Sequence, residues 1–158
     1  MIDYTMFVLP VNNDNSYNEL VEKGIAFLHD DNRLAALACF DKAFAIGKSP
    51  ELLSYLSYCM AAERGQIYEA LKLCNDALSQ EPDNPVHYLN LGRIYLHAGK
   101  KEEALLTLRK GLSLGENQTL KSILEKIGTR GKPVLSFLHR NNFLNKYLGL
   151  LLHRFKLR

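Results

Sequence analysis

The side chains that most often perform catalysis or bind metal ions are present, but their spacing supports neither activity. The histidines do not show the spacing of metal ligands; they are His29, His87, His97, His139 and His153. The sequence contains no glycine-rich phosphate loop, no G-x-S-x-G motif and no cysteine–histidine arrangement for nucleophilic catalysis. Glu102 and Glu103 are adjacent, but they fall in the expected first turn of a helix, where the helix dipole favours acidic side chains. We therefore expect a protein that is not an enzyme and that holds no cofactor and no metal ion.

The cysteines have a structural explanation. Cys39, Cys59 and Cys74 are odd in number, lie within helical patterns and form no C-x-x-C pair. We expect them to be reduced, buried side chains in a cytoplasmic protein. The first residues lack the basic start and long apolar run of a signal peptide, and no segment approaches the roughly 18 apolar residues that a membrane span requires.

The sequence repeats at a constant step along the chain. Three segments align, namely AALACFDKAF, EALKLCNDAL and EALLTLRKGL. Their equivalent positions are Ala36, Ala70 and Ala104, then Phe40, Cys74 and Leu108, then Ala43, Ala77 and Gly111. Gly65 and Gly99 keep the same step, and Gly24 and Gly92 are two steps apart. A period of this length, about 34 residues, is typical of repeated supersecondary units that stack on one another.

Each unit reads as a pair of helices. In the third unit, four residues recur at helical spacing and share one face: Tyr88, Leu91, Gly92 and Tyr95. Asn84 before Pro85 predicts the start of this helix, Gly99 its end, and residues 101–114 the second helix. Gly92 and Ala104 are small, so the two helix backbones can approach closely.

These residues resemble the tetratricopeptide repeat, whose pattern is W-x2-L-G-x2-Y, then A-x3-F, then P. The third unit carries it at Tyr88, Leu91, Gly92, Tyr95, Ala104 and Leu108, with Glu116 in place of the proline. The first unit supplies Leu20, Gly24, Phe27, Ala36, Phe40 and Ala43, with Lys23 where leucine is usual. The second supplies Ala70, Ala77 and Pro82. The resemblance implies an all-α fold, a right-handed superhelical stack of three helical hairpins of the small bacterial type.

The first helix of the second unit fits the pattern only when it is shifted by one residue. Its packing face then consists of Leu53, Leu56, Ser57 and Met60. This shift implies one extra residue before Gly65. We therefore expect Ser57 to take the position that Gly24 and Gly92 occupy in the other units.

The resemblance and the charge pattern together divide the chain into three parts. Residues 1–16 are an N-terminal extension, and residues 17–127 are the repeat domain. The repeats are predicted at 17–50, 51–84 and 85–118, and a capping helix at 118–127. Residues 128–158 form a tail with a predicted helix near 142–156. The tail carries seven Lys or Arg and no Asp or Glu, whereas residues 1–127 have a net charge of −4.

A stack of such hairpins exposes a concave surface lined by the first helix of each pair. Rotation by 100° per residue away from the packing face predicts the residues of this groove. They are Val21, Ile25, Tyr55, Tyr58, Val86, Leu89, Arg93 and His97. A partly apolar groove with tyrosines and one arginine favours a peptide or an amphipathic helix as its ligand. The same residues would also suit a core covered by the N-terminal segment or by the tail.

Some members of the family bind the carboxylate ends of chaperones through lysine and asparagine in this groove. The corresponding residues here are Val21, Ile25, Val86 and Asn90. The resemblance therefore does not imply chaperone-tail binding. It implies a non-catalytic adaptor or scaffold that binds another protein.

The tail leaves three partners open. Its basic, apolar helix could dock on the repeats, associate with a second copy or a partner protein, or lie on an anionic membrane surface. Nucleic acid is disfavoured, because leucines dilute the basic residues and the aromatic residues are needed for packing. The function predicted first is therefore an adaptor, and the alternative is a peripheral membrane tether.

Overall fold

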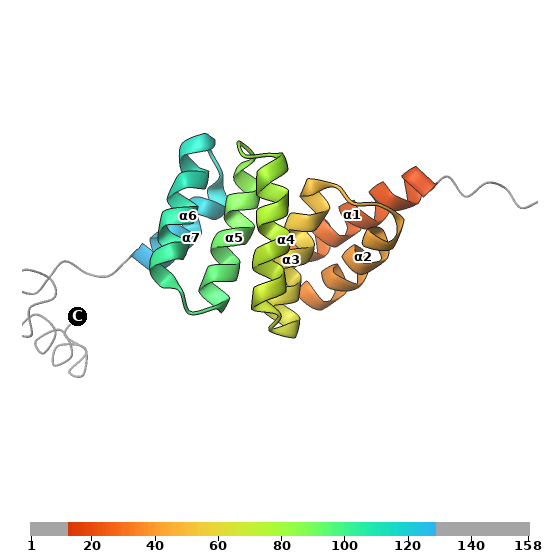
Figure 1. The fold of residues 1–158 in the computed structure, drawn as a ribbon, viewed down its shortest axis with the longest axis horizontal. Coiled ribbons are helices and arrows are strands. Elements are labelled where there is room, and N and C mark those ends of the chain that lie inside the picture. Colours follow the sequence, from red (N-terminus) through yellow and green to blue (C-terminus); the bar gives the residue numbers. More distant parts are fainter. Residues whose placement is uncertain (1–12, 129–158) are drawn as a thin grey trace, which may run out of the picture. The chain divides into compact units, whose positions relative to one another are not determined.

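A computed structural model describes residues 13–128, and every regular element within that range is an α-helix (Figure 1). The helices are α1 (Asn13–His29), α2 (Arg33–Ile46), α3 (Pro50–Arg64), α4 (Ile67–Gln80), α5 (Pro85–His97), α6 (Lys101–Leu114) and α7 (Gln118–Gly128). The chain divides into two units, residues 1–124 and 125–158. Residues 13–124 of the first unit carry the packing and the site considered below.

Polar caps and prolines set the starts of the helices. The side-chain oxygens of Asn32, Ser49 and Asn84 accept hydrogen bonds from backbone N–H groups of α2, α3 and α5, at 3.2, 3.1 and 3.0 Å. Pro50 and Pro85 open α3 and α5, where the missing N–H group is not needed. The start predicted at Asn84 and Pro85 is confirmed, as is the second helix at residues 101–114.

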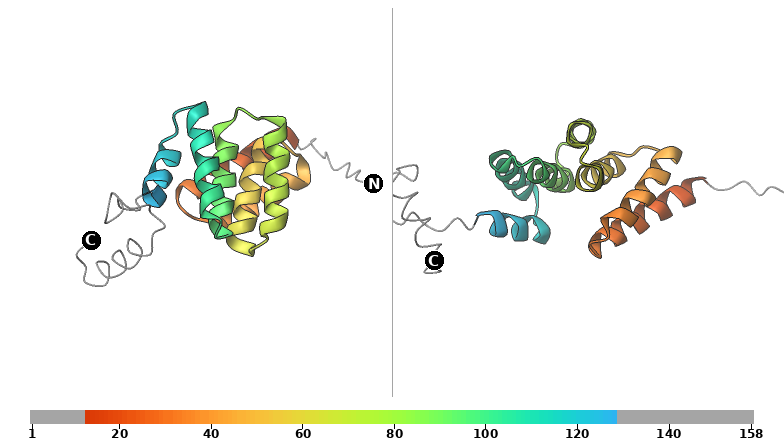
Figure 2. Two further views of the ribbon diagram at one scale, coloured as in Figure 1. Left: turned by 60° about the vertical axis from the view of Figure 1, so that its left-hand side comes forward. Right: turned by 90° about the horizontal axis from the view of Figure 1, so that it is seen from below.

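The helices pack as successive pairs, which Figure 2 shows from two further directions. α1 packs on α2, α3 on α4, and α5 on α6, and α5 also packs on both helices of the preceding pair. The first pair joins the second mainly through α2 and α3. The Tyr17 hydroxyl adds a link from α1 by donating a hydrogen bond to Ser49 Oγ at 2.7 Å.

Small residues bring the two helices of a pair into close contact. A Cβ on Gly24 would lie 2.3 Å from Phe40 Cε1, and a Cβ on Gly92 would lie 2.5 Å from Leu108 Cγ. Both distances are far below van der Waals contact, so each glycine is required by the large side chain opposite it. The alanines at the repeat positions are fully buried; they are Ala36, Ala70 and Ala104.

The one-residue shift predicted for the second unit is present. Ser57 is fully buried and its hydroxyl lies within hydrogen-bonding reach of Cys74, the residue equivalent to Phe40 and Leu108. α3 is also longer than α5, with 15 residues against 13. The second hairpin therefore replaces a glycine and a bulky partner with a serine and a small partner.

The outer boundaries differ from the sequence prediction in detail. α1 begins at Asn13, within the predicted N-terminal extension, and Pro50 is the first residue of α3 rather than the last of the first unit. α7 covers the predicted capping helix. Residues 1–12, and the tail helix predicted near 142–156, lie outside the described residues.

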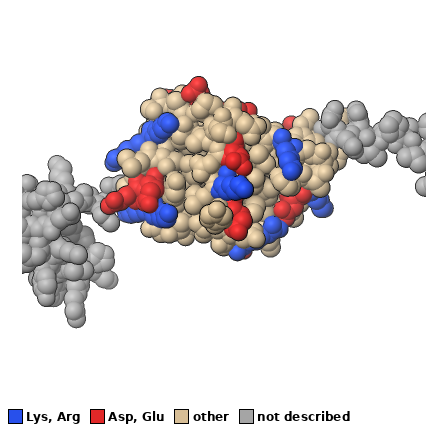
Figure 3. Space-filling view, viewed as in Figure 1, with Lys and Arg blue, Asp and Glu red and all other residues tan. Residues whose placement is uncertain are grey.

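Charged side chains are mixed on the face seen in Figure 3, where basic and acidic residues alternate over the helices. Several charged side chains of the described residues form ion pairs. Arg33 bonds Glu63 at 2.9 Å and Asp31 at 3.2 Å, and Arg64 pairs with Asp41. Such exposed pairs each contribute at most about 1 kcal/mol to stability.

Candidate functional site

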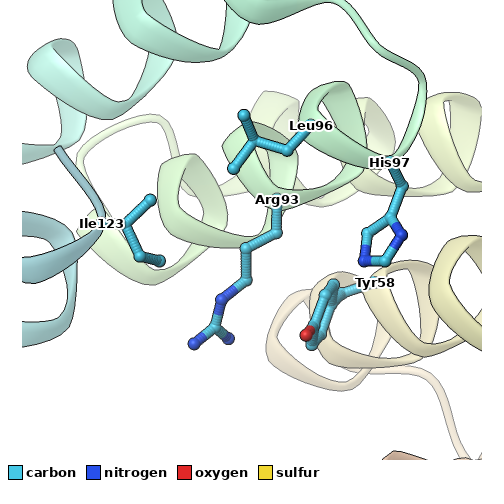
Figure 4. Close-up of a pocket in the computed structure, with 5 residues that line it drawn as sticks. All are labelled: Tyr58, Arg93, Leu96, His97 and Ile123. Atoms are coloured by element: carbon cyan, nitrogen blue, oxygen red, sulfur yellow. The ribbon is translucent and has the colours of Figure 1, made fainter. Parts of the chain in front are cut away.

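A pocket among the described residues lies along α3, α5 and α7. Its volume is about 310 Å³, and it is lined by Tyr58, Arg93, Leu96, His97 and Ile123. We refer to these five residues as the Arg93 pocket (Figure 4). Tyr58 comes from α3, Ile123 from α7, and the other three from α5. The pocket therefore joins side chains from three helices, two of which are the first helices of their hairpins.

Arg93 and Tyr58 form the centre of this pocket. The Arg93 guanidinium carbon lies 4.8 Å from the centroid of the Tyr58 ring, a cation–π arrangement. Tyr58 is only 7% exposed, and Arg93 is half-buried. The ring of His97 lies beside Tyr58, with 6.0 Å between the centroids and a tilt of 49°. The buried Tyr58 ring thus provides an aromatic face against which the partly exposed Arg93 guanidinium packs.

Arg93 has no carboxylate partner among residues 13–128. Glu51 and Glu63 act electrostatically on side chains that Arg93 also affects. Glu63 accepts a hydrogen bond from Arg33, and Glu51 forms no ion pair with Arg93. Hydrogen bonds to Glu63, and secondly to Tyr58, raise the pKa of the Arg33 guanidinium. The charge of Glu63 is therefore matched by Arg33, and the charge of Arg93 stays unmatched.

The pocket has a single permanent charge. Burial, and then the positive charge of Arg33, lower the pKa of His97. His97 is therefore neutral at neutral pH and can act as a hydrogen-bond donor or acceptor. Ile123 adds apolar surface on the other side of Arg93, and Leu96 adds apolar surface beyond the backbone end of the Arg93 side chain. The arrangement can bind one anionic group that is surrounded by apolar groups.

Two fully buried polar side chains fix α5 against its neighbours. Asn90 Nδ2 donates a hydrogen bond to Ser54 Oγ of α3 at 3.0 Å, and His87 Nε2 lies 3.0 Å from Glu81 Oε2. Within the described part of the chain, His87 Nδ1 and Asn90 Oδ1 have no partner. The Asn90–Ser54 hydrogen bond fixes the position of α5 along the axis of α3. It therefore also fixes where Arg93 of α5 contacts Tyr58 of α3.

The structure brings together three of the eight residues predicted for the groove, namely Tyr58, Arg93 and His97. Of the others, Val21 and Leu89 are buried, and Ile25, Tyr55 and Val86 are half-buried. The Tyr55 ring stacks on Phe40, with 5.8 Å between centroids. Whether any of the eight contacts a partner stays a prediction.

Sequence reasoning missed Leu96 and Ile123. Ile123 lies in the predicted capping helix at 118–127, which was not included in the predicted groove, yet it follows Leu89 by one repeat period. Extending the repeat into α7 as the first helix of a fourth unit would therefore have placed it in the groove. For Leu96 the repeat pattern offers no comparable signal.

The remaining reactive groups lie in the core. Cys39, Cys59 and Cys74 are buried and free. Burial raises the pKa of the Cys59 thiol to about 12 and that of Cys74 to about 11, so neither forms a thiolate near neutral pH. Among residues 13–128 no group of histidine, cysteine or acidic side chains could hold a metal ion. No helix in this range has the length and apolar character needed to cross a membrane.

Comparison with known proteins agrees with this architecture. A family model described as a tetratricopeptide repeat matches residues 61–127. Residues 61–127 thus match the tetratricopeptide repeat family. No curated protein sequence matches it.

Solved tetratricopeptide repeat domains share the fold at low sequence identity. The domain of OM64 from Arabidopsis has a TM-score of 0.57 and 20% identity, over 75% of this chain and 99% of that one. The Sgt2 domain from Aspergillus fumigatus has a TM-score of 0.56 and 20% identity, over 78% and 88%. The first such domain of RPAP3, bound to the HSP90 peptide SRMEEVD, has a TM-score of 0.55 and 22% identity, over 72% and 91%. The predicted all-α superhelical stack of hairpins is confirmed.

Proposed function

We propose that this repeat protein is a non-catalytic adaptor that binds a segment of a partner protein at the Arg93 pocket. The observation that carries the proposal is the pocket itself, in which α3, α5 and α7 present apolar side chains around one unmatched guanidinium. A small hydrophilic substrate would find few polar contacts there. A polypeptide segment supplies both apolar side chains and polar groups, so it matches the pocket better.

The relatives support a protein ligand in general terms. The RPAP3 domain was solved with a peptide bound, and its fold is the fold of this chain. That peptide is from HSP90, and we do not propose such a ligand here. The positions that the family resemblance assigns to chaperone-tail binding carry Val21, Ile25, Val86 and Asn90, of which Val21 and Asn90 are buried.

The test uses two double variants of the full-length chain with matched chemistry. His97→Ala with Ile123→Ser removes a ring and an apolar side chain from the pocket. His29→Ala with Leu106→Ser makes the same changes at exposed residues of α1 and α6 that do not line it. Circular dichroism should show equal helix content in both.

Affinity capture from the cell of origin should recover a defined set of proteins with the wild type and with the control variant. We expect the pocket variant to lose at least about ten-fold of that material, equivalent to ~1.4 kcal/mol. Equal recovery by all three proteins would refute the proposal, since the partner would then bind elsewhere.

The alternative function, a membrane tether, depends on residues 128–158, which carry seven Lys or Arg and no acidic residue. It stays a prediction, because the tail is outside the described residues. Flotation with anionic phosphatidylserine vesicles tests it directly. A tether requires the full chain to float and a chain lacking residues 140–158 to remain at the bottom of the gradient.

A further inference from the structure

We propose that the segment bound at the Arg93 pocket carries an internal aspartate or glutamate that pairs with Arg93, next to an apolar residue that contacts Leu96 and Ile123. The inference rests on the proposed function and specifies the chemistry of the partner. Its first support is the state of Arg93, a half-buried guanidinium held on the face of Tyr58. A guanidinium has five N–H donors in a fixed plane, an arrangement that matches a carboxylate.

The other arginines of the described range show why Arg93 is distinctive. Arg33 bonds Asp31 and Glu63, and Arg64 pairs with Asp41. Arg109 makes no such bond within residues 13–128, but it is exposed on α6, where water solvates its charge. Arg93 alone among these four combines partial burial with the lack of an acidic partner. Partial burial weakens hydration and strengthens the attraction to an incoming anion.

A single carboxylate fits the pocket better than a phosphate or a nucleic acid. Arg93 is the only permanently charged residue of the five, and the lowered pKa of His97 keeps that ring neutral near neutral pH. A phosphate carries up to two charges, and a nucleic-acid backbone needs a series of cations. One positive charge bordered by apolar side chains matches one carboxylate beside an apolar residue.

The position of Arg93 favours an internal residue of the partner over a chain end. Figure 4 shows the guanidinium between Ile123 on one side and Tyr58 with His97 on the other. A carboxylate at that point therefore has apolar contacts available on both sides. An acidic residue inside a peptide continues in both directions and can use both, whereas a terminal carboxylate can use only one.

The carboxylate side chain does not come from this chain's tail. Residues 128–158 contain no aspartate and no glutamate. The basic tail and the guanidinium also carry charge of the same sign. The composition of the tail thus excludes the tail as the source of that carboxylate side chain.

The experiment starts with a phage-displayed library of random twelve-residue peptides, selected on the immobilised full-length chain. The strongest binders are synthesised with acetylated N-termini and amidated C-termini, which removes the terminal carboxylate. Isothermal titration then measures each peptide, and its Glu→Gln or Asp→Asn form, against four proteins. These are the wild type, Arg93→Gln, Arg93→Lys and the matched charge control Arg109→Gln.

We expect the selected peptides to contain an acidic residue next to Leu, Ile, Val or Phe. On the wild type and on Arg109→Gln, the Glu→Gln change should weaken binding by about ten-fold to a hundred-fold. On Arg93→Gln the two peptide forms should bind within two-fold of each other. Arg93→Lys should retain part of the difference, because lysine keeps the charge but not the planar pair of donors.

The outcomes separate this inference from the proposed function. Selected peptides without acidic residues, or a Glu→Gln loss that persists on Arg93→Gln, would overturn the inference while the pocket remains a peptide site. Binding that requires the free C-terminal carboxylate would overturn it as well. If no selected peptide weakens on the His97→Ala, Ile123→Ser variant, both proposals fail. If an Arg93 variant does not fold, a Glu→Gln change that leaves binding to the wild type unaltered still overturns the inference.

Discussion

The second and third hairpins follow the same repeat pattern, but their first helices end in different ways. At the end of α5, the N–H groups of Gly99 and Lys100 donate to the carbonyls of Leu96 and Tyr95, at 3.0 and 2.9 Å. At the end of α3, the N–H groups of Gly65 and Gln66 both donate to the carbonyl of Met60. The bonds thus span three and five residues in α5, but five and six in α3. The extra residue of the second unit is taken up in this wider last turn.

The difference shows how one inserted residue can change a surface and leave the core intact. A strictly constant repeat period would place Tyr58 level with Gly24 and Gly92, against the second helix of its hairpin. The shift gives that position to Ser57, and Tyr58 moves by one residue, or about 100°, around the helix. There it lies under Arg93. The central contact of the pocket therefore depends on the irregularity of the second unit.

We expect the largest effect on stability from placing in the third hairpin, at Gly92, the serine that the second hairpin has at the equivalent position, Ser57. Gly92→Ser places a Cβ 2.5 Å from Leu108 Cγ, where Leu108 is fully buried. We expect a loss of roughly 1–3 kcal/mol in the free energy of unfolding, measured by urea denaturation.

A second substitution then replaces Leu108, the residue opposite Gly92, with the cysteine that the second hairpin has at the equivalent position, Cys74. Leu108→Cys in the Gly92→Ser background recreates the Ser57 and Cys74 pair. The double variant should be less destabilised than the sum of the two single variants, because the clash is removed while apolar volume is lost. Simple additivity of the two losses would show that Gly92 is not required by Leu108.

A smaller effect is expected from removing the extra residue of the second hairpin. Deletion of Arg64 should let α3 end with the same turn as α5. The residues before Arg64 should keep their orientation around the helix axis. We expect the free energy of unfolding to change by no more than about 1 kcal/mol, of which the exposed pair with Asp41 accounts for a part. Thermal melting followed by circular dichroism measures it.

Arg64→Ala is the control for this deletion, since it removes the ion pair but keeps the length of the helix. A deletion that costs several kcal/mol more than Arg64→Ala would mean that the extra residue is not confined to the last turn. The wider turn would then be the result of a change further back in α3.

The sequence was sufficient for the hairpins because their determinants are local or strictly periodic. Asn84 with Pro85 is a short-range start signal, and the glycine and alanine positions recur because backbone contact tolerates no larger side chain. The shift in α3 was also predictable, since Ser57 is the small residue that restores the pattern. These features need no knowledge of which helices lie next to each other.

The pocket was less predictable because burial on a helix face depends on the neighbouring helices. A helical wheel places Leu89 and Arg93 on one face, but in the structure Leu89 is buried and Arg93 is half-buried. Val21 is buried within the first hairpin, which joins the second mainly through α2 and α3.

The helix ends offer a further, smaller comparison, because Asp31, Gly65 and Gly99 follow the three first helices at equivalent positions of the repeat. All three have positive φ, at 55°, 66° and 71°. This conformation is unstrained for glycine but costs energy for aspartate. We expect Asp31→Gly to stabilise the chain by about 0.5–1 kcal/mol in urea denaturation, even though the exposed ion pair with Arg33 is lost.

The neighbouring Asp30→Gly is the matched control, because Asp30 is equally exposed and is not among the positive-φ residues. It should not stabilise the chain, since glycine there only increases the freedom of the unfolded state. If the two variants changed the stability in the same direction and by the same amount, the repeated left-handed position would carry no strain.

The smallest effect concerns His97, the residue of α5 that lies beside Tyr58 of α3. Burial first, and the charge of Arg33 second, lower the pKa of His97 in the folded chain below its ordinary value near 6.5. The folded state therefore binds fewer protons than the unfolded state, so this contribution to stability is complete above about pH 6.5 and is lost as the pH falls through the folded pKa. An NMR titration of the His97 ring should show the lowered pKa, and Arg33→Gln should restore only part of the shift because burial is the larger cause. A ring that titrates at 6.5 or above in the wild type would mean that His97 is not held in the pocket against Tyr58. In that case the shifted Tyr58 of the second hairpin would contact Arg93 but not His97.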